Sequence, residues 1–128
     1  MKYSIDKQEK YSVIKVDEEK LDSTKAPDFK SRFVTLQAEG VKNLIVDLSP
    51  VKYIDSSGLS ALLVGNRLFG EGGGSFVLAD VSDHVMKLIN ISQLDKVLDL
   101  LPTVEEAVDT VFMNEIEGDL GSADEDAG

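Results

Sequence analysis

Four consecutive residues, Asp55-Ser56-Ser57-Gly58, combine side chains that could do chemistry. A carboxylate and two hydroxyls could cap a helix, supply a nucleophile, or accept a covalently attached group such as phosphate. They follow an apolar run at 43–49 and precede a helical pattern, so they occupy the loop where a strand passes into a helix. In open α/β sheets, loops at the carboxyl ends of parallel strands bind ligands and partners. A helix start also tolerates an anion, because it holds unpaired N–H groups.

The sequence argues against a catalytic serine in this loop. A nucleophile elbow needs glycine two places before and two places after the serine, and around Ser57 those places hold Asp55 and Leu59. His84 is the single histidine and therefore the single possible imidazole base. Its position beside Ser82, a predicted helix cap, indicates a surface residue. We therefore expect that the protein is not an enzyme.

Two further patterns could suggest a nucleotide or metal site. The glycine-rich run at 70–74 follows a predicted helix and precedes a strand, whereas a phosphate-binding loop follows a strand and opens a helix. Four carboxylates near predicted element ends could hold Mg²⁺ only if they converged, and surface solvation explains them more simply. These carboxylates are Asp22, Asp47, Asp55 and Asp80. With no Cys and one His, the chain also leaves little room for a transition-metal site, so we expect no metal and no cofactor.

Composition limits the class of partner. A chain of 128 residues is the size of one ordinary domain. Its formal net charge of -11 argues against binding to nucleic acid or to anionic lipid, since both need a basic surface. Charges interrupt the apolar residues of segment 1–16, which therefore resembles neither a signal peptide nor a membrane span. We expect a cytoplasmic protein that binds a protein partner or a small ligand.

The end of the chain has a different composition. Residues 115–128 contain six acidic residues and no Lys or Arg. Such a composition is typical of a solvated, disordered tail, and the alternative is an acidic segment that attracts a basic partner. We therefore predict one domain over residues 1–114 and an acidic tail over residues 115–128.

The periodicity of apolar residues predicts alternating strands and helices. The strand at 11–16 follows a possible hairpin partner at 1–5, and further strands are expected at 43–49, 75–80 and 96–101. Helices are expected at 25–39, at 57–70, after Ser82, and from Val104 behind a capping box that begins at Thr103. This order predicts an α/β sandwich with a mixed, mostly parallel sheet of four or five strands and about four helices.

The segment 43–63, NLIVDLSPVKYIDSSGLSALL, resembles the signature region of STAS domains, in particular of the anti-sigma factor antagonist (anti-anti-sigma factor) family. In that family a strand ending in Asp-Leu leads through a hydrophobic connection into Asp-Ser-Ser-Gly-Leu or a close variant. The segment 76–108 also resembles the last strand–helix–strand–helix portion of the family. The resemblance covers about residues 3–113 and implies a STAS-type sandwich.

This resemblance implies a switch that phosphorylation controls. In the family, the unphosphorylated protein binds an anti-sigma factor that is also a serine kinase, and so releases a sigma factor for transcription. The kinase phosphorylates the antagonist, which ends binding, and a PP2C-type phosphatase restores it. The implied phosphorylation site is Ser57, with Ser56 as the alternative. The implied partner-binding residues are Asp22, Ser23, Asp55, Ser56, Ser57, Gly58 and Leu59.

A second interpretation keeps the fold but removes the switch. The chain would then be an accessory subunit of a lipid or anion transporter, or part of a stress-signalling scaffold. The intact pair Ser56-Ser57, which can be phosphorylated, favours the antagonist.

Overall fold

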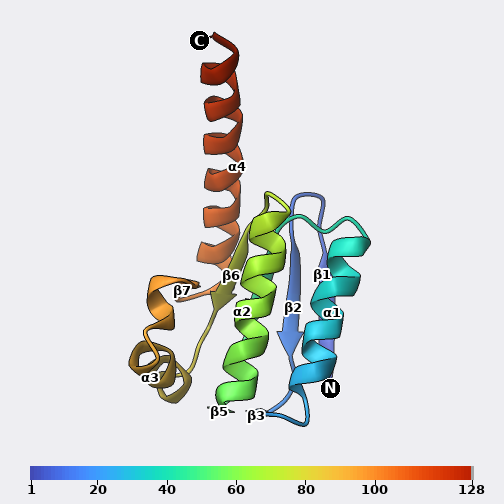
Figure 1. Cartoon of the computed structure of the whole chain (residues 1–128), viewed down its shortest axis with the longest axis vertical. Helices are drawn as coiled ribbons and strands as arrows, with labels where there is room; N and C mark the ends of the chain where they lie inside the picture. The colour runs from blue at the N-terminus through green and yellow to red at the C-terminus, as the bar shows by residue number, and fades with distance from the viewer. Residues whose placement is uncertain (128) are drawn as a thin grey trace.

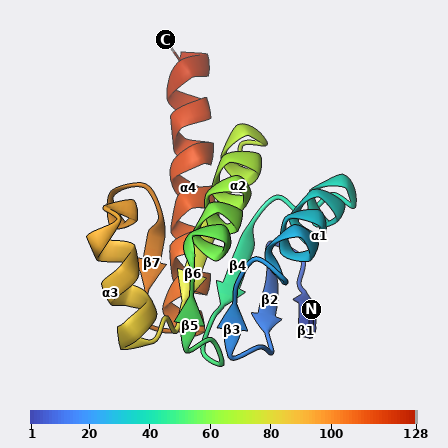
Figure 2. The ribbon, with the colours of Figure 1, turned by 60° about the horizontal axis from the view of Figure 1, so that its bottom comes forward.

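The structure is a computed structural model that describes the backbone of residues 1–127 and the side chains of residues 1–118. Within these residues the main sheet has five strands in the order β1-β2-β4-β6-β7 (Figure 1), and all five are labelled in Figure 2. The first pair is antiparallel and the other pairs are parallel, so the predicted mixed, mostly parallel sheet is confirmed. The strands are β1 (Tyr3–Lys7), β2 (Ser12–Val16), β4 (Leu44–Asp47), β6 (Phe76–Ala79) and β7 (Asp99–Leu101).

Helices cover both faces of this sheet. Figures 1 and 2 show α1, α2 and α3 on one face and α4 on the other, which confirms the predicted α/β sandwich. Over residues 1–127 the helices are α1 (Ala26–Ala38), α2 (Ser56–Glu71), α3 (Asp83–Ile91), a short 3₁₀ helix (Leu94–Lys96) and α4 (Val104–Ala127).

Strand β4 lies in the middle of the sheet and is covered on both sides. Leu44 and Val46 belong to the core beneath α1 and α2, whereas Ile45 belongs to a second core beneath α4. All three are fully buried. Successive side chains of a strand point to opposite faces, so a strand between two helical layers needs an almost continuous apolar run.

A second, two-stranded sheet was not predicted. β3 (Lys20–Leu21) pairs in parallel with β5 (Tyr53–Ile54), and Leu21 lies opposite Ile54. Each strand has two residues, which is too short for apolar periodicity to identify. The pairing brings the residue after Leu21 close to the residue after Ile54, so it joins two loops that are distant in the sequence.

The helices differ in how their first turns are capped. The N-cap of α1 is Lys25, which has no side-chain capping hydrogen bond. The carbonyl of Asp22 instead accepts from the N–H groups of Lys25 and Ala26 at 3.0 and 2.9 Å. At α2 the cap is Asp55 and neither serine. Ser82 caps α3 as predicted.

Helix α4 is longer than its apolar pattern predicts. The helix continues through Ala127, so residues 115–127, for which composition predicts disorder, are part of it. The side chain of Glu115 contacts Asn43 and Lys42, and the division into a domain over residues 1–114 and an acidic tail over residues 115–128 stays a prediction. No helix within residues 1–127 is both long enough and apolar enough to cross a membrane.

A buried amide fixes α4 to the sheet. The side chain of Asn43, which is 3% exposed, donates to the carbonyl of Lys10 at 2.9 Å and to Glu115 Oε1 at 2.8 Å. Its Oδ1 accepts from the N–H of Ser75 at 2.9 Å. Lys42 Nζ lies 3.3 Å from Glu115 Oε1. The hydrogen bond from Asn43 and the contact with Lys42 lower the pKa of Glu115.

Replacement of Glu115 by Gln should lower the free energy of unfolding at neutral pH by about 1 kcal/mol or less, because the charge that Asn43 and Lys42 stabilise is lost. The pKa of Glu115 is lowered on folding, so its contribution is present above the ordinary value of 4.5 and is lost as the pH falls through the lowered pKa. Urea unfolding at several pH values measures this. The matched control is Glu117→Gln, and an equal effect of both variants would contradict the prediction.

Candidate functional site

The Asp55-Ser56-Ser57-Gly58 segment forms the start of α2. Asp55 has an extended backbone, and its Oδ1 accepts from the N–H of Gly58 at 3.0 Å. Its carbonyl accepts from the N–H of Leu59 at 3.0 Å. Asp55 therefore does the capping, and Ser56 and Ser57 are the first two residues of the helix. Their N–H groups belong to the first turn, where a helix offers no acceptor of its own.

The short β3–β5 pairing places Asp22 beside this helix start. The N–H of Asp55 lies 3.4 Å from the carbonyl of Leu21, the residue before Asp22. Gly58 packs against the same place: a Cβ there would collide with the Leu21 carbonyl and lie 2.6 Å from Ile54 Cγ1. The structure thus brings together two predicted partner-binding loops, 22–23 and 55–57.

Both serines line one hollow of about 270 Å³ between the starts of α1 and α2. Ser57 is half-buried and Ser56 is exposed. Among the side chains that the structure describes, Lys30 forms no ion pair, and it is the one cation in the lining of this hollow. The lining residues are Ser23, Ala26, Pro27, Lys30, Ser56, Ser57 and Ser60. Hydroxyls, a cation and a helix N-terminus together can accommodate an anion such as phosphate.

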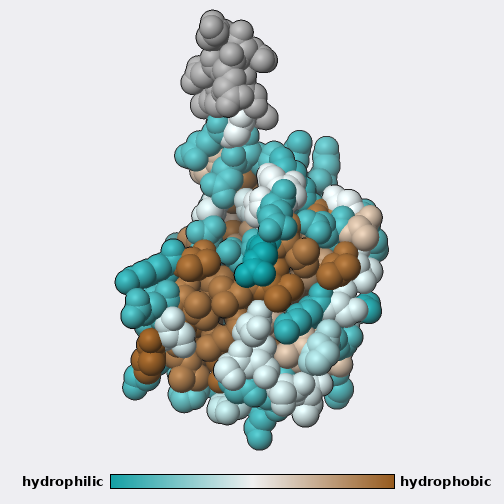
Figure 3. All heavy atoms as spheres, viewed as in Figure 1, coloured by the Kyte–Doolittle hydropathy of each residue, from teal (hydrophilic) through white to brown (hydrophobic). Residues whose placement is uncertain are grey.

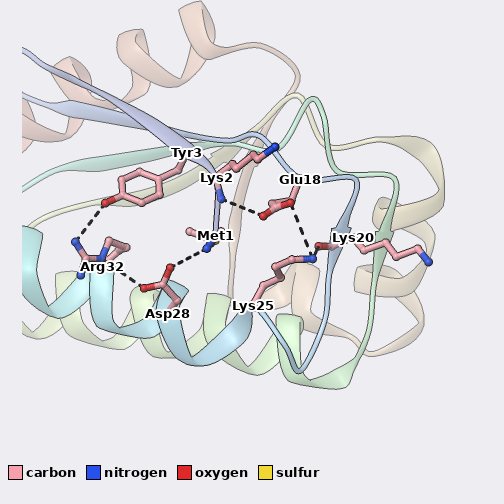
Figure 4. Close-up of polar contacts among 8 residues, drawn as sticks. All are labelled: Met1, Lys2, Tyr3, Glu18, Lys20, Lys25, Asp28 and Arg32. Atoms are coloured by element: carbon pink, nitrogen blue, oxygen red, sulfur yellow. Dashed lines mark hydrogen bonds and ion pairs between the residues drawn. The ribbon is translucent and has the colours of Figure 1, made fainter.

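Polar contacts hold the loop that carries Asp22 and Ser23 (Figure 4). Glu18 accepts from the N–H of Lys2 at 3.0 Å, and its carboxylate lies 4.0 Å from Lys25 Nζ. Lys25 Nζ also lies 3.5 Å from the carbonyl of Lys20. These contacts connect both ends of the loop to each other and to Lys2, the residue before β1.

Asp22 is an ionised carboxylate on this surface. Its Oδ1 accepts from the hydroxyl and from the N–H of Thr24, the latter at 3.0 Å. The hydrogen bond from the Thr24 hydroxyl, with smaller contributions from the Thr24 N–H and from the charge of Lys25, lowers the pKa of Asp22. Its negative charge is therefore present at neutral pH.

The predicted partner-binding residues differ in exposure. Gly58 is buried, and Leu59 is half-buried and packs against the main core. The other predicted residues lie on or near the surface: Asp22, Ser23, Asp55, Ser56 and Ser57. No group of three His, Cys or acidic residues that could hold a metal occurs in the described part of the chain.

Several residues at this end of the molecule were not predicted from the sequence. Lys30 lies three residues after Pro27, and Ser60 lies three residues after Ser57. Helical spacing could therefore have placed each of them beside the predicted helix starts. Tyr53, which is 44% exposed, stacks against His84 with ring centroids 6.5 Å apart. His84 is exposed, as predicted, and among the described residues no hydrogen bond joins it to Ser57.

Comparisons with known proteins agree with this fold. The family model for the STAS domain matches residues 2–107. The anti-sigma-B factor antagonist of Bacillus subtilis (strain 168) is 28% identical over 88 residues, which are 69% of this chain and 80% of that protein. The unphosphorylated form of the anti-sigma factor antagonist SpoIIAA is similar with a TM-score of 0.72 and 23% identity, covering 86% of this chain and 96% of that chain. The phosphorylated form of SpoIIAA, a Bacillus cell fate determinant, has a TM-score of 0.66 and 23% identity, covering 86% of this chain and 99% of that chain.

Proposed function

Because this chain belongs to the STAS domain family, we propose that it is a cytoplasmic anti-sigma factor antagonist that phosphorylation of Ser57 switches off. In its unphosphorylated form it binds an anti-sigma factor that is also a serine kinase, and a sigma factor is released. A PP2C-type phosphatase reverses the modification. The protein is regulatory, and Ser57 is a substrate of the kinase.

The observation that carries this proposal is the division of roles at the start of α2. Asp55 caps the helix, so the hydroxyl of Ser57 is not needed for that purpose. Both serine hydroxyls line the hollow that also contains Lys30. A group attached to Ser57 can therefore be accommodated with the cap intact.

A phosphate on Ser57 changes the surface more than the fold. It adds a charge of roughly -1.5 to -2 and three acceptor oxygens. The first-turn N–H groups of α2 and the ammonium of Lys30 can stabilise that charge, because both carry positive potential. The same phosphate adds bulk and negative charge between Asp22 and Asp55, where a partner would dock. Phosphorylation should therefore weaken docking and leave the domain folded.

The preference for Ser57 over Ser56 comes from the match to the family motif. The two side chains line the same hollow, and Ser56 is the more exposed of the two. An experiment on the proposed site must therefore separate the two serines.

The first step of that experiment identifies the partner by affinity purification with the unmodified chain. A co-purifying protein with a histidine-kinase-like ATPase fold supports an antagonist. An ABC ATPase would instead favour the transporter subunit and contradict the proposal.

Incubation with this kinase and ATP should give one phosphate, mapped by mass spectrometry to Ser57. Ser57→Ala should abolish the modification, and the matched control Ser56→Ala should retain it. Modification of Ser56 alone, or no modification of the wild-type chain, would overturn the assignment of Ser57.

A further inference from the structure

Helix α4 carries most of the charge imbalance of the protein. Residues 104–127 contain nine acidic residues and no Lys or Arg. The chain has 24 acidic and 13 basic residues, so the rest of it holds fifteen acidic and thirteen basic ones and has a net charge near -2. The acidity is thus a property of one helix, and the α/β body is close to neutral.

The same helix has two apolar faces. Ala107 and Val111 are fully buried against the sheet. On the outside, Phe112, Met113 and Ile116 are 42%, 54% and 52% exposed, and we call these three residues the α4 strip. Ile116 follows Met113 by three residues and Phe112 by four, so the three side chains share the outer side of the helix.

Acidic side chains flank the α4 strip at helical spacing. Asp109 precedes Phe112 and Met113 by three and four residues, and Glu117 follows Met113 by four. Both carboxylates are exposed, and neither forms an ion pair with any side chain that the structure describes. Glu115 lies on the sheet side, where Lys42 and Asn43 hold it, so it does not contribute to this outer face.

The α4 strip lies at the opposite end of the molecule from Ser57. The contact of Glu115 with Asn43 fixes this part of α4 beside the start of β4, whereas Ser57 follows the carboxyl end of β5. Figure 1 shows α4 continuing well beyond the sheet, with the start of α2 at the other end. Phe112 makes an edge contact with Tyr11, at 6.1 Å between ring centroids, and about half of each side chain of the strip is open to solvent.

We propose that the outer face of α4 is a docking surface for a basic amphipathic helix of a partner protein. The apolar side chains of the partner's helix would cover the α4 strip, and the Lys and Arg side chains of that helix would pair with Asp109 and Glu117. Three large apolar residues exposed on one side of a helix indicate a surface that a partner covers. Because the flanking charges are all negative, they favour a partner with positive charges. Two copies of this helix would repel each other, and nucleic acid or anionic lipid would be repelled as well. The surface acts independently of Ser57, so one chain can hold two partners.

The direct test is binding of a short synthetic peptide of leucine and lysine patterned as an amphipathic helix, measured by fluorescence anisotropy with the full chain. We expect binding that weakens with salt, because charge pairs contribute to it. The triple variant Phe112→Ser, Met113→Ser, Ile116→Ser should raise the Kd at least about tenfold, and so should Asp109→Asn with Glu117→Gln. Ser57→Ala should leave the Kd unchanged, which separates this result from the proposed switch.

The matched controls replace exposed apolar and acidic side chains that lie outside α4. Figure 3 shows an apolar area on the face that carries α2 and α3. Among the described residues outside α4, Ile91 and Val97 are exposed apolar side chains. Replacement of these two residues by Ser, or of the exposed Glu71 and Asp95 by Gln and Asn, should leave the Kd within about twofold of the wild-type value. No binding by the wild-type chain, or an equal loss in the controls, would overturn the proposal. So would a dimer in light scattering that the triple variant dissociates, since the occupant would then be a second copy.

Discussion

The variant Ser57→Asp should lose at least about a hundredfold in affinity for the proposed anti-sigma factor, equivalent to about 2.8 kcal/mol, while its Tm stays within a few degrees of wild type. A carboxylate in the first turn of α2 interacts favourably with the helix dipole, so the fold has little to lose. Asp55 still accepts from the N–H of Gly58, and the cap stays in place. The added charge instead lies in the proposed docking surface, where Asp22 and Asp55 are already negative.

Two matched variants separate charge from position. Ser57→Ala removes the hydroxyl without adding charge and should retain most of the affinity. Ser56→Asp adds the same charge one residue earlier, on the more exposed serine, and should cost less. Isothermal titration calorimetry measures the affinities and circular dichroism the Tm. Unfolding of Ser57→Asp at ambient temperature, or a larger loss of affinity in Ser56→Asp, would contradict the proposed role of Ser57.

The parts of the fold that the sequence predicted are those set by local pattern. The run at 43–49 identified β4 because a strand covered on both faces must be apolar throughout. The predicted hairpin between the first two segments is the β1–β2 pair. The predicted cap at Thr103 is confirmed, since its hydroxyl accepts from the N–H of Glu106 at 3.1 Å, while the Glu106 carboxylate accepts from that hydroxyl and not from the Thr103 N–H. Such signals depend on neighbours within a few residues.

The features that the sequence did not predict depend on distant partners. β3 and β5 are stabilised by each other, and their pairing puts Asp22 beside the α2 start across more than thirty residues of chain. Glu115 is held by Asn43 from 72 residues away, and the acidic composition around Glu115 carries no signal of that contact. Three capping candidates stood at 55–57, and composition could not distinguish them. Asp55 is the cap because its extended backbone lets its carboxylate reach the N–H of Gly58.

Replacement of Gly58 by Ala should destabilise the domain by about 2–4 kcal/mol, although Ala is ordinarily better than Gly in a helix by about 1 kcal/mol. The added Cβ would collide with the backbone carbonyl of Leu21, which cannot move without displacing β3, and would lie 2.6 Å from Ile54 Cγ1. The matched control is Gly70→Ala in the same helix, where a Cβ meets nothing within 4 Å and stability should be unchanged or higher. Thermal unfolding should show a Tm lower by roughly 10 °C for the first variant and not for the second.

Relief of the collision must move the α2 start away from the loop that carries Asp22, so affinity for the proposed partner should fall with stability. Equal stability of the two variants would show that α2 can shift freely, and the placement of Ser57 beside Asp22 would then lose its structural basis.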